Sequence, residues 1–366
     1  MNACDSCLKR GHLIGLLGPR IAELSKPRAR RGVRLLLTLP DDDLIYAVAG
    51  ERAHEVFAEI EQFRPNPMRA HMRARRVRAV CMHDDAYPAR LRNLADPPNP
   101  LFVRSETEAL AGIEETPTVA IVGGRKASTY ALEVAHELGR GLAVSGVPVI
   151  SGLALGVDAA AHRGALAGRG SAIAVLGSGA DVPYPNSHRQ LYAEVASKGA
   201  VISELPPGTT ARRWAFPARN RIMAALVEMV VVVEAKIGSG TLITAEFAES
   251  LPCQIGVVPG RVNAEAAAGS NKLLADGAMP VLGVESVLDA LFGVGQRPAP
   301  PPVRVKLDPA GRAVLAAVEA GDSPLAARDV HIKDVRAALG RLEVLGLVRR
   351  DGLGGYERTG LDCVHA

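Results

Sequence analysis

The most constraining feature of this sequence is a series of short apolar runs between residues 118 and 292. Seven runs of Val, Ile, Ala and Leu end near Gly, Ser or Pro: TVAIVGG (118–124), VPVISGLA (147–154), SAIAVLGSG (171–179), AVISELP (200–206), EMVVVVEA (228–235), QIGVVPG (254–260) and MPVLG (279–283). A strand that is apolar on both faces is typical of a parallel sheet with helices on each side.

Segments with helical spacing separate these runs. They are ALEVAHELGRGLAVSG (131–146), VDAAAHRGALAG (157–168), HRQLYAEVASKG (188–199), RNRIMAAL (219–226), TLITAEFAESL (241–251) and SVLDALF (286–292). Regular alternation of strand and helix predicts βαβ units. The expected fold is therefore α/β: an extended Rossmann-like, doubly wound parallel sheet.

The flanking segments have a different character. Three helical patterns come first, HLIGLLGPRIAEL (12–24), DDDLIYAVAG (41–50) and AHEVFAEIEQF (53–63), and a Pro-rich connector with one strand follows at 86–105. A second Pro-rich stretch, GVGQRPAPPPVRVKLD, reads as a linker. We predict an N-terminal helical domain over 1–85, a Rossmann-like domain over 86–292, the linker over 293–308 and a C-terminal domain over 309–366.

The C-terminal segment has the pattern of a winged helix, with three helices followed by a two-stranded wing. Its recognition-helix stretch, IKDVRAALGRLEVLG (332–346), carries Lys333, Arg336 and Arg341 but also Asp334 and Glu343. Such a mixed helix favours protein docking or weak DNA contact.

The charge of the chain is unevenly distributed. The net charge is only +4, yet the first 80 residues hold two arginine clusters: Arg28, Arg30, Arg31 and Arg34, then Arg69, Arg73, Arg75, Arg76 and Arg78. Either these clusters form a solvated surface or they attract nucleic acid. With no apolar signal region and no run of membrane-spanning length, we expect a cytoplasmic protein without a membrane partner.

Five cysteines form no disulfide framework. Cys4 and Cys7 make one CxxC, whereas a structural zinc site needs four ligands. Cys81 and His83 could complete a site only if the fold brings them across the intervening chain. The expectation is therefore free thiols, no metal and no cofactor.

Ligands of an open parallel sheet bind at the carboxyl ends of its strands. The residues that follow the predicted strands are mainly glycine, serine or cations: 123–128, 151–156, 177–179, 203–204, 238–241 and 259–261. Glycine lets backbone N–H groups approach an anion, and a following helix adds its dipole. Several such turns on one edge predict a ligand that carries phosphate.

The pattern favours a polynucleotide as that ligand. The GxxxxGK[ST] motif is absent from the sequence, and GSGADV (177–182) has valine at the third glycine position of a dinucleotide fingerprint. Many cations lie along the same edge: Arg125, Lys126, Arg213, Arg219, Arg221 and Arg261. Trp214 and Phe216 stand among them and could stack on bases, although a ring before a helix can also be its hydrophobic cap.

The successive blocks IVGGRKAS, SGLALGVDAAAHRGAL, AVLGSGADVPYPNSHRQL, GAVISELPPG, FPARNRIMAAL, VVVEAKIGSGTLITA and VVPGRVNAEAAAGSNKLLADGA resemble the signature blocks of the DNA-processing protein A (Smf) family, over about residues 86–291. The resemblance implies a homodimer without enzymatic activity that binds single-stranded DNA regardless of sequence. It also implies loading of the recombinase RecA onto DNA coated by single-strand-binding protein, in natural transformation.

Carried over by this resemblance, the expected DNA-binding residues are Gly123, Gly124, Arg125, Lys126, Ser151, Gly152, Arg213, Phe216, Arg219, Asn220, Arg221, Ser239, Gly240 and Thr241. Asp158 and His162 are expected to order the neighbouring loop. The chain departs from the family pattern at Gly124, where Ser or Thr is usual, at Ala131, where Gly is usual, and in its start, which lacks the family's Gly-Ile-Gly hairpin.

A different class of function stays open: a nucleotide-binding sensor, or a nucleotide hydrolase that resembles lysine-decarboxylase-like proteins. Those proteins use PGGxGTxxE, with glutamate as the acid–base group. Here the position three residues after Thr241 is Thr244, and Glu246 comes five after. On a helix this shifts the carboxylate to another face, which weighs against hydrolysis.

Overall fold

The computed structural model describes residues 3–24, 36–297, 305–328, 330–344, 347–350, 355–358 and 363–364. The chain forms two compact units, residues 1–299 and 300–366. The first unit holds both the helical N-terminal segment and the predicted Rossmann-like part. The arginines at positions 28–34 lie outside the described residues.

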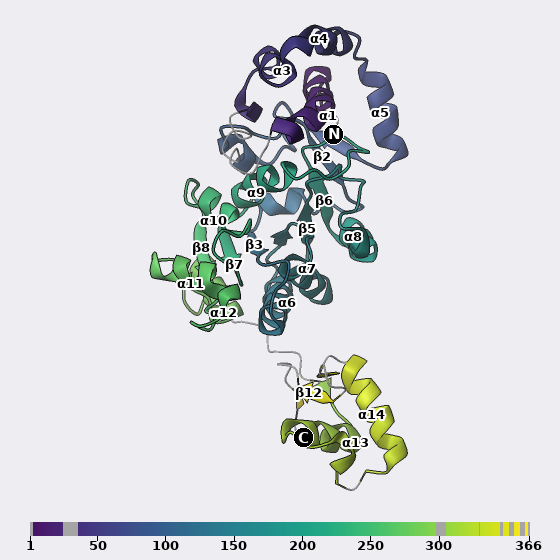
Figure 1. Ribbon diagram of the computed structural model, residues 1–366, viewed down its shortest axis with the longest axis vertical. Coiled ribbons are helices and arrows are strands. Elements are labelled where there is room, and N and C mark those ends of the chain that lie inside the picture. Colours follow the sequence, from purple (N-terminus) through teal and green to yellow (C-terminus); the bar gives the residue numbers. More distant parts are fainter. Residues whose placement is uncertain are drawn as a thin grey trace. The chain divides into compact units, whose positions relative to one another are not determined.

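A nine-stranded sheet organises the first unit (Figure 1). Its order is β1-β2-β6-β5-β4-β3-β7-β8-β9, in which β3 to β9 are parallel, while β2 pairs antiparallel with both β6 and the edge strand β1. The strands are β1 (Arg78–Val80), β2 (Leu101–Arg104), β3 (Val119–Val122), β4 (Val149–Ser151), β5 (Ala172–Val175), β6 (Ala200–Ser203), β7 (Met229–Val232), β8 (Gln254–Val257) and β9 (Met279–Pro280).

The predicted α/β fold is confirmed, because all seven predicted apolar runs form strands of this sheet. Both faces are buried: Val119 and Ile121 pack on one side, and Ala120 and Val122 on the other. The first face is covered by α6 (Thr129–Val144), α7 (Val157–Ala167), α8 (Arg189–Lys198) and α12 (Val284–Phe292). The second is covered by α9 (Ala215–Ala225), α10 (Leu242–Ala248) and α11 (Ala268–Ala275).

Four described α-helices precede the sheet: α1 (Asp5–Leu24), α3 (Asp41–Ala49), α4 (Ala53–Glu61) and α5 (Pro65–Ala74). Helix α1 starts well before the predicted residue 12 and lies beside β2 (Figure 1). Its glycines permit this close contact: a Cβ on Gly11 would lie 2.9 Å from Pro100 Cδ, and one on Gly15 would lie 2.6 Å from Pro206 Cγ. Spaced four residues apart, they share one helix face.

The second unit contains β10 (Val305–Lys306), α13 (Pro309–Glu319), α14 (Ile332–Val344), β11 (Val348–Arg350), β12 (Tyr356–Arg358) and β13 (Cys363–Val364). Strands β11 and β12 pair as an antiparallel ribbon, as expected of a wing. The middle predicted helix, AARDV (326–330), does not form over its described residues, and only the end of the 3-10 turn η6 (Pro324–Ala326) overlaps it. The winged helix therefore stays a prediction.

Further 3-10 turns are η1 (Gly50–Arg52), η2 (Ala89–Asn93), η3 (Ala111–Glu114), η4 (Asn186–His188) and η5 (Glu265–Ala267). Among the described residues, no helix combines the length and the apolar character needed to cross a membrane.

Candidate nucleic-acid interface

A pocket opens at the carboxyl ends of β3, β4 and β5, beside the start of α9. Such crevices at strand ends are where open α/β sheets bind ligands. It is lined by Arg125, Gly152, Ala154, Leu155, Leu176, Gly177, Tyr184, Pro185, Phe216 and Arg219. Arg125 of the first predicted turn, Gly152 of the second, and Phe216 and Arg219 of FPARNR therefore converge on one place.

An aromatic pair and a cation form the mouth of this pocket. Phe216 is half-buried in the first turn of α9, and its ring centroid lies 5.2 Å from that of Tyr184. The exposed Arg125 guanidinium carbon lies 5.0 Å from the Phe216 ring centroid. Tyr184 was missed in the sequence, although its place just beyond the Gly177–Gly179 turn could have indicated it.

Arg219 lines the pocket and supplies a buried positive charge there. Its guanidinium donates to the Val175 carbonyl and, through Nε, to Asn220 Oδ1 at 3.0 Å. Burial lowers the pKa of Arg219 to about 10, so the side chain stays protonated at neutral pH. A Cβ on Gly152 would lie 2.0 Å from Arg219 Nη2, so a larger residue there would require the Arg219 guanidinium to move.

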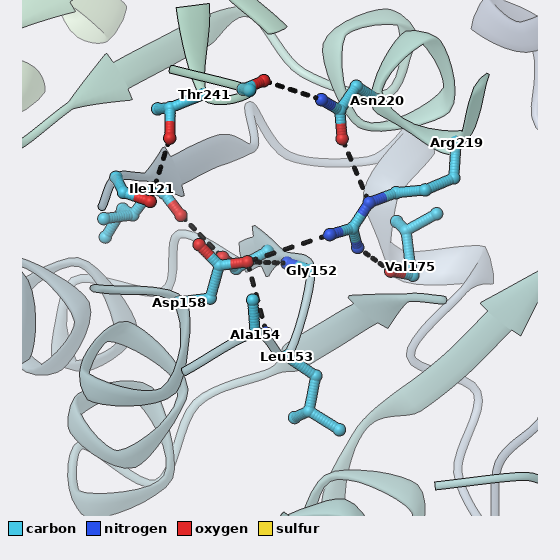
Figure 2. A network of polar contacts seen from close by, with 12 residues as sticks. Ile121, Gly152, Leu153, Ala154, Asp158, Val175, Arg219, Asn220 and Thr241 are labelled. Atoms are coloured by element: carbon cyan, nitrogen blue, oxygen red, sulfur yellow. Dashed lines mark hydrogen bonds and ion pairs between the residues drawn. The ribbon is translucent and has the colours of Figure 1, made fainter. Parts of the chain in front are cut away.

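Asp158 holds the adjacent loop, as expected. Its Oδ2 accepts from the backbone N–H groups of Gly152 at 3.1 Å and Ala154 at 3.3 Å, and it lies 3.9 Å from Arg219 Nη2 (Figure 2). Burial raises its pKa, and the nearby Arg219 opposes that rise. His162 is likewise buried on α7, and desolvation lowers its pKa to about 3, so it packs as a neutral side chain.

Intramolecular hydrogen bonds link the residues that follow β3 to those that follow β7. Gly124 N donates to the Glu234 carbonyl at 2.7 Å, and Ser128 N donates to Glu234 Oε2 at 2.8 Å. Thr241 Oγ1 donates to the Gly123 carbonyl at 2.9 Å. The start of α6, where a dinucleotide would place its phosphates, therefore already holds a carboxylate.

Several predicted contact residues form hydrogen bonds with the protein backbone near the pocket. Ser151 is fully buried and donates to the Ile121 carbonyl at 2.6 Å, and Asn220 Nδ2 donates to the Gly240 carbonyl at 3.2 Å (Figure 2). Ser239 Oγ accepts from Thr241 N at 3.2 Å. Side chains exposed around the same edge are those of Arg125, Lys126 and Arg213.

The position of Arg221 contradicts its expected contact with phosphate. It is 1% exposed, its Nη1 and Nη2 donate to Glu204 at 2.9 and 2.7 Å, and its Nε lies 2.8 Å from Asp96 Oδ2. Burial lowers its pKa, but the two carboxylates outweigh burial and raise it. The helix predicted over 219–226 begins earlier, at Ala215, so the two arginines lie beyond the first turn of α9 and point to different sides.

Trp214 is also structural. It is 2% exposed, and its Nε1 donates to the Gly18 carbonyl of α1 at 3.0 Å. It shares a core with Leu13, Ile14 and Leu17 of α1. Of the two interpretations of the Trp214 ring, stacking on bases or a hydrophobic cap of the helix, its burial fits the cap.

Comparisons with known proteins agree on one family. The sequence model described as DNA recombination-mediator protein A matches residues 78–292. Protein Smf of Synechocystis sp. is 32% identical over 313 residues, 75% of this chain and 78% of that protein. The X-ray structure of DNA processing protein A from Streptococcus pneumoniae has a TM-score of 0.61 at 28% identity, covering 80% of this chain and 99% of that chain.

A second solved structure is that of DNA processing protein A from Helicobacter pylori, described for its unique single-stranded DNA binding mode. It matches with a TM-score of 0.53 at 29% identity and covers 59% of this chain and 95% of that chain.

Proposed function

We propose that this chain, which belongs to the DNA recombination-mediator protein A family, binds single-stranded DNA at the pocket mouth formed by Arg125, Tyr184 and Phe216. The observation that carries the proposal is the half-buried Phe216 ring next to the exposed Arg125 guanidinium, above the buried charge of Arg219. A ring offers a stacking face to any base, and guanidinium groups neutralise phosphates.

The shape of the site favours a single strand. Phe216 lies in a pocket at the strand ends, and a base can reach it only after leaving a base stack. Bases of a duplex are already stacked on their neighbours. Exposed Lys126 and Arg213 extend the positive charge beyond the pocket, which suits a backbone with a charge at every nucleotide.

Backbone turns complete the proposed interface. Gly152, Ser239 and Gly240 lie near strand ends, and Asn220 and Thr241 hold the last of these turns through hydrogen bonds. Gly123, Gly124 and Ser151 act from the interior by fixing β3 and β4. Arg221 is not part of the proposed contact surface.

The biological role proposed is delivery of single-stranded DNA to RecA during natural transformation, by a cytoplasmic homodimer that catalyses no reaction. Family membership and the likeness to the Helicobacter pylori protein support this role. RecA loading onto DNA coated by single-strand-binding protein is its most specific element. It is tested by whether the protein shortens the lag of RecA filament formation on such DNA.

The proposal is tested by fluorescence anisotropy with labelled single-stranded and duplex oligonucleotides of equal length. We expect clear preference for the single strand and similar affinity for different base compositions. Equal affinity for duplex would contradict it. Incubation with nucleoside monophosphates tests the alternative of a nucleotide hydrolase, for which the structure offers only a buried Thr244 and an exposed Glu246 at the expected helix. Released base would favour hydrolysis.

A further inference from the structure

Three thiols and one imidazole converge where the start of the chain meets the edge of the sheet. The metal-binding atoms of Cys4, Cys7, Cys81 and His83 all lie within 4.8 Å of one another. Cys4 Sγ lies 3.3 Å from Cys7 Sγ, and His83 Nδ1 lies 3.4 Å from both of these sulfurs and 3.8 Å from Cys81 Sγ. The fold thus makes the long-range approach that the sequence alone did not predict.

The three sulfur–nitrogen separations, 3.4 to 3.8 Å, are those of a zinc tetrahedron, whereas Cys4 Sγ and Cys7 Sγ, 3.3 Å apart, would have to separate slightly to bind the same ion. With Zn–S bonds of about 2.3 Å and Zn–N bonds of about 2.0–2.1 Å, tetrahedral geometry puts two sulfurs about 3.8 Å apart and a sulfur and nitrogen about 3.6 Å apart. Three sulfurs and one nitrogen are also a ligand set of structural zinc sites.

Backbone hydrogen bonds hold the two segments that carry the cluster next to each other. Ala3 N donates to the Ala79 carbonyl of β1 at 2.9 Å, which places Cys4 and the first turn of α1 beside the residues that follow β1. Asp84 N donates to the Cys81 carbonyl at 2.8 Å and closes the turn that carries His83.

Polar groups surround the ligands as in a second coordination shell. The Arg92 guanidinium donates to the carbonyls of Met82 and Asp84, on either side of His83. Asn99 Oδ1 accepts from Met82 N, next to His83, at 3.4 Å. Such contacts orient the ligands of a metal site. Cys7 and Cys81 are buried while His83 is exposed, which leaves a path for an ion.

We propose that Cys4, Cys7, Cys81 and His83 bind one structural zinc ion that fastens the start of α1 to the end of β1. With four protein ligands, the ion has no open position for catalysis. The ion also supports the DNA-binding edge indirectly, because α1 accepts the Trp214 hydrogen bond two residues before Phe216.

Zinc analysis of the purified full-length chain tests this proposal independently of DNA binding. We expect about one zinc ion per chain by plasma mass spectrometry, and an absorption spectrum of tetrahedral thiolate coordination after Co²⁺ replacement. Cys7→Ser and Cys81→Ser should lose the ion and lower the melting temperature by roughly 5 °C or more. Cys253→Ser is the matched control, since this cysteine lies outside the cluster, and it should keep the ion.

His83→Cys separates ligation from mere packing or hydrogen bonding. Four thiolates also form a structural zinc site, so this variant should keep stoichiometric zinc, whereas His83→Ala should bind it more weakly. A zinc-free wild-type protein from zinc-supplemented cells would overturn the proposal, as would a Cys4–Cys7 disulfide found by mass spectrometry in freshly purified protein. Equal zinc in wild type and Cys81→Ser would also overturn it.

Discussion

Two buried arginines two positions apart on α9 extend from different sides of the helix and contact different groups. Each helical residue turns the chain by about 100°, so Arg219 and Arg221 point about 200° apart. Arg219 reaches the pocket, and Arg221 reaches the buried pair Asp96 and Glu204. A sequence pattern of Arg-Asn-Arg identifies neither environment, because the difference depends on where the helix begins.

Arg221→Ala is expected to destabilise the fold. The substitution leaves Glu204 and Asp96 as buried carboxylates without their partner, at a cost of roughly 3–5 kcal/mol. Urea unfolding of wild type and variant measures the change. A loss below about 1 kcal/mol would show that the carboxylates find other compensation.

Arg125→Ala is expected to affect binding and leave stability unchanged, because Arg125 is exposed. Loss of one phosphate contact should reduce the slope of log K against log salt by about 0.7 for a single strand. The control is Arg163→Ala, an exposed arginine on α7 outside the pocket. An unchanged slope for Arg125→Ala would place Arg125 off the DNA.

At the scale of elements, glycines decide how closely helices approach. A Cβ on Gly164 of α7 would lie 1.9 Å from the His136 carbonyl oxygen of α6. Gly164→Ala should therefore lower the free energy of unfolding, although alanine favours helix by about 1 kcal/mol. Gly340→Ala on α14 is the matched control, because a Cβ there meets nothing within 4 Å. Equal effects on unfolding would contradict the packing argument.

The strands were predictable because their apolar runs are continuous and end in turn residues. Helix α11 was missed, since AGSNKLLA has little apolar periodicity. Helix α5 was not predicted, and Pro65 and Pro67 lie in its first turn, where proline is tolerated. The start of α1 was missed because CDSCLKRG reads as polar, although Gly11, Gly15 and Gly18 share a spacing that could have indicated a closely packed helix.

The candidate site could be predicted only in part. Residues after parallel strands converge by topology, and Arg125 and Gly152, which follow β3 and β4, line the same pocket. Burial of Arg221 depends on carboxylates from other parts of the sequence, and the approach of His83 to Cys4 depends on how the chain folds back between them. Such long-range contacts leave no local pattern.

At the scale of the whole molecule, the first unit should fold and bind alone. Part of the predicted linker belongs to it: Arg297 donates to the Ser145 carbonyl at 3.0 Å, and its guanidinium carbon lies 4.1 Å from the Phe292 ring centroid. A chain ending at residue 299 should keep wild-type melting behaviour and single-strand affinity within about threefold. A chain cut after Leu291 loses both contacts and should be less stable. A large loss of affinity at 299 would assign DNA contact to the second unit.

The most direct test of the central claim is the single-strand affinity and melting temperature of Phe216→Ala. Base stacking contributes roughly 1–3 kcal/mol per base, so binding should weaken about tenfold or more with an unchanged salt slope. Phe57→Ala is the matched control, since Phe57 is also half-buried and pairs with an exposed tyrosine, Tyr46, at 5.2 Å, outside the pocket. It should bind as wild type. A Phe216→Ala protein that melts much lower but binds normally when folded would contradict the account.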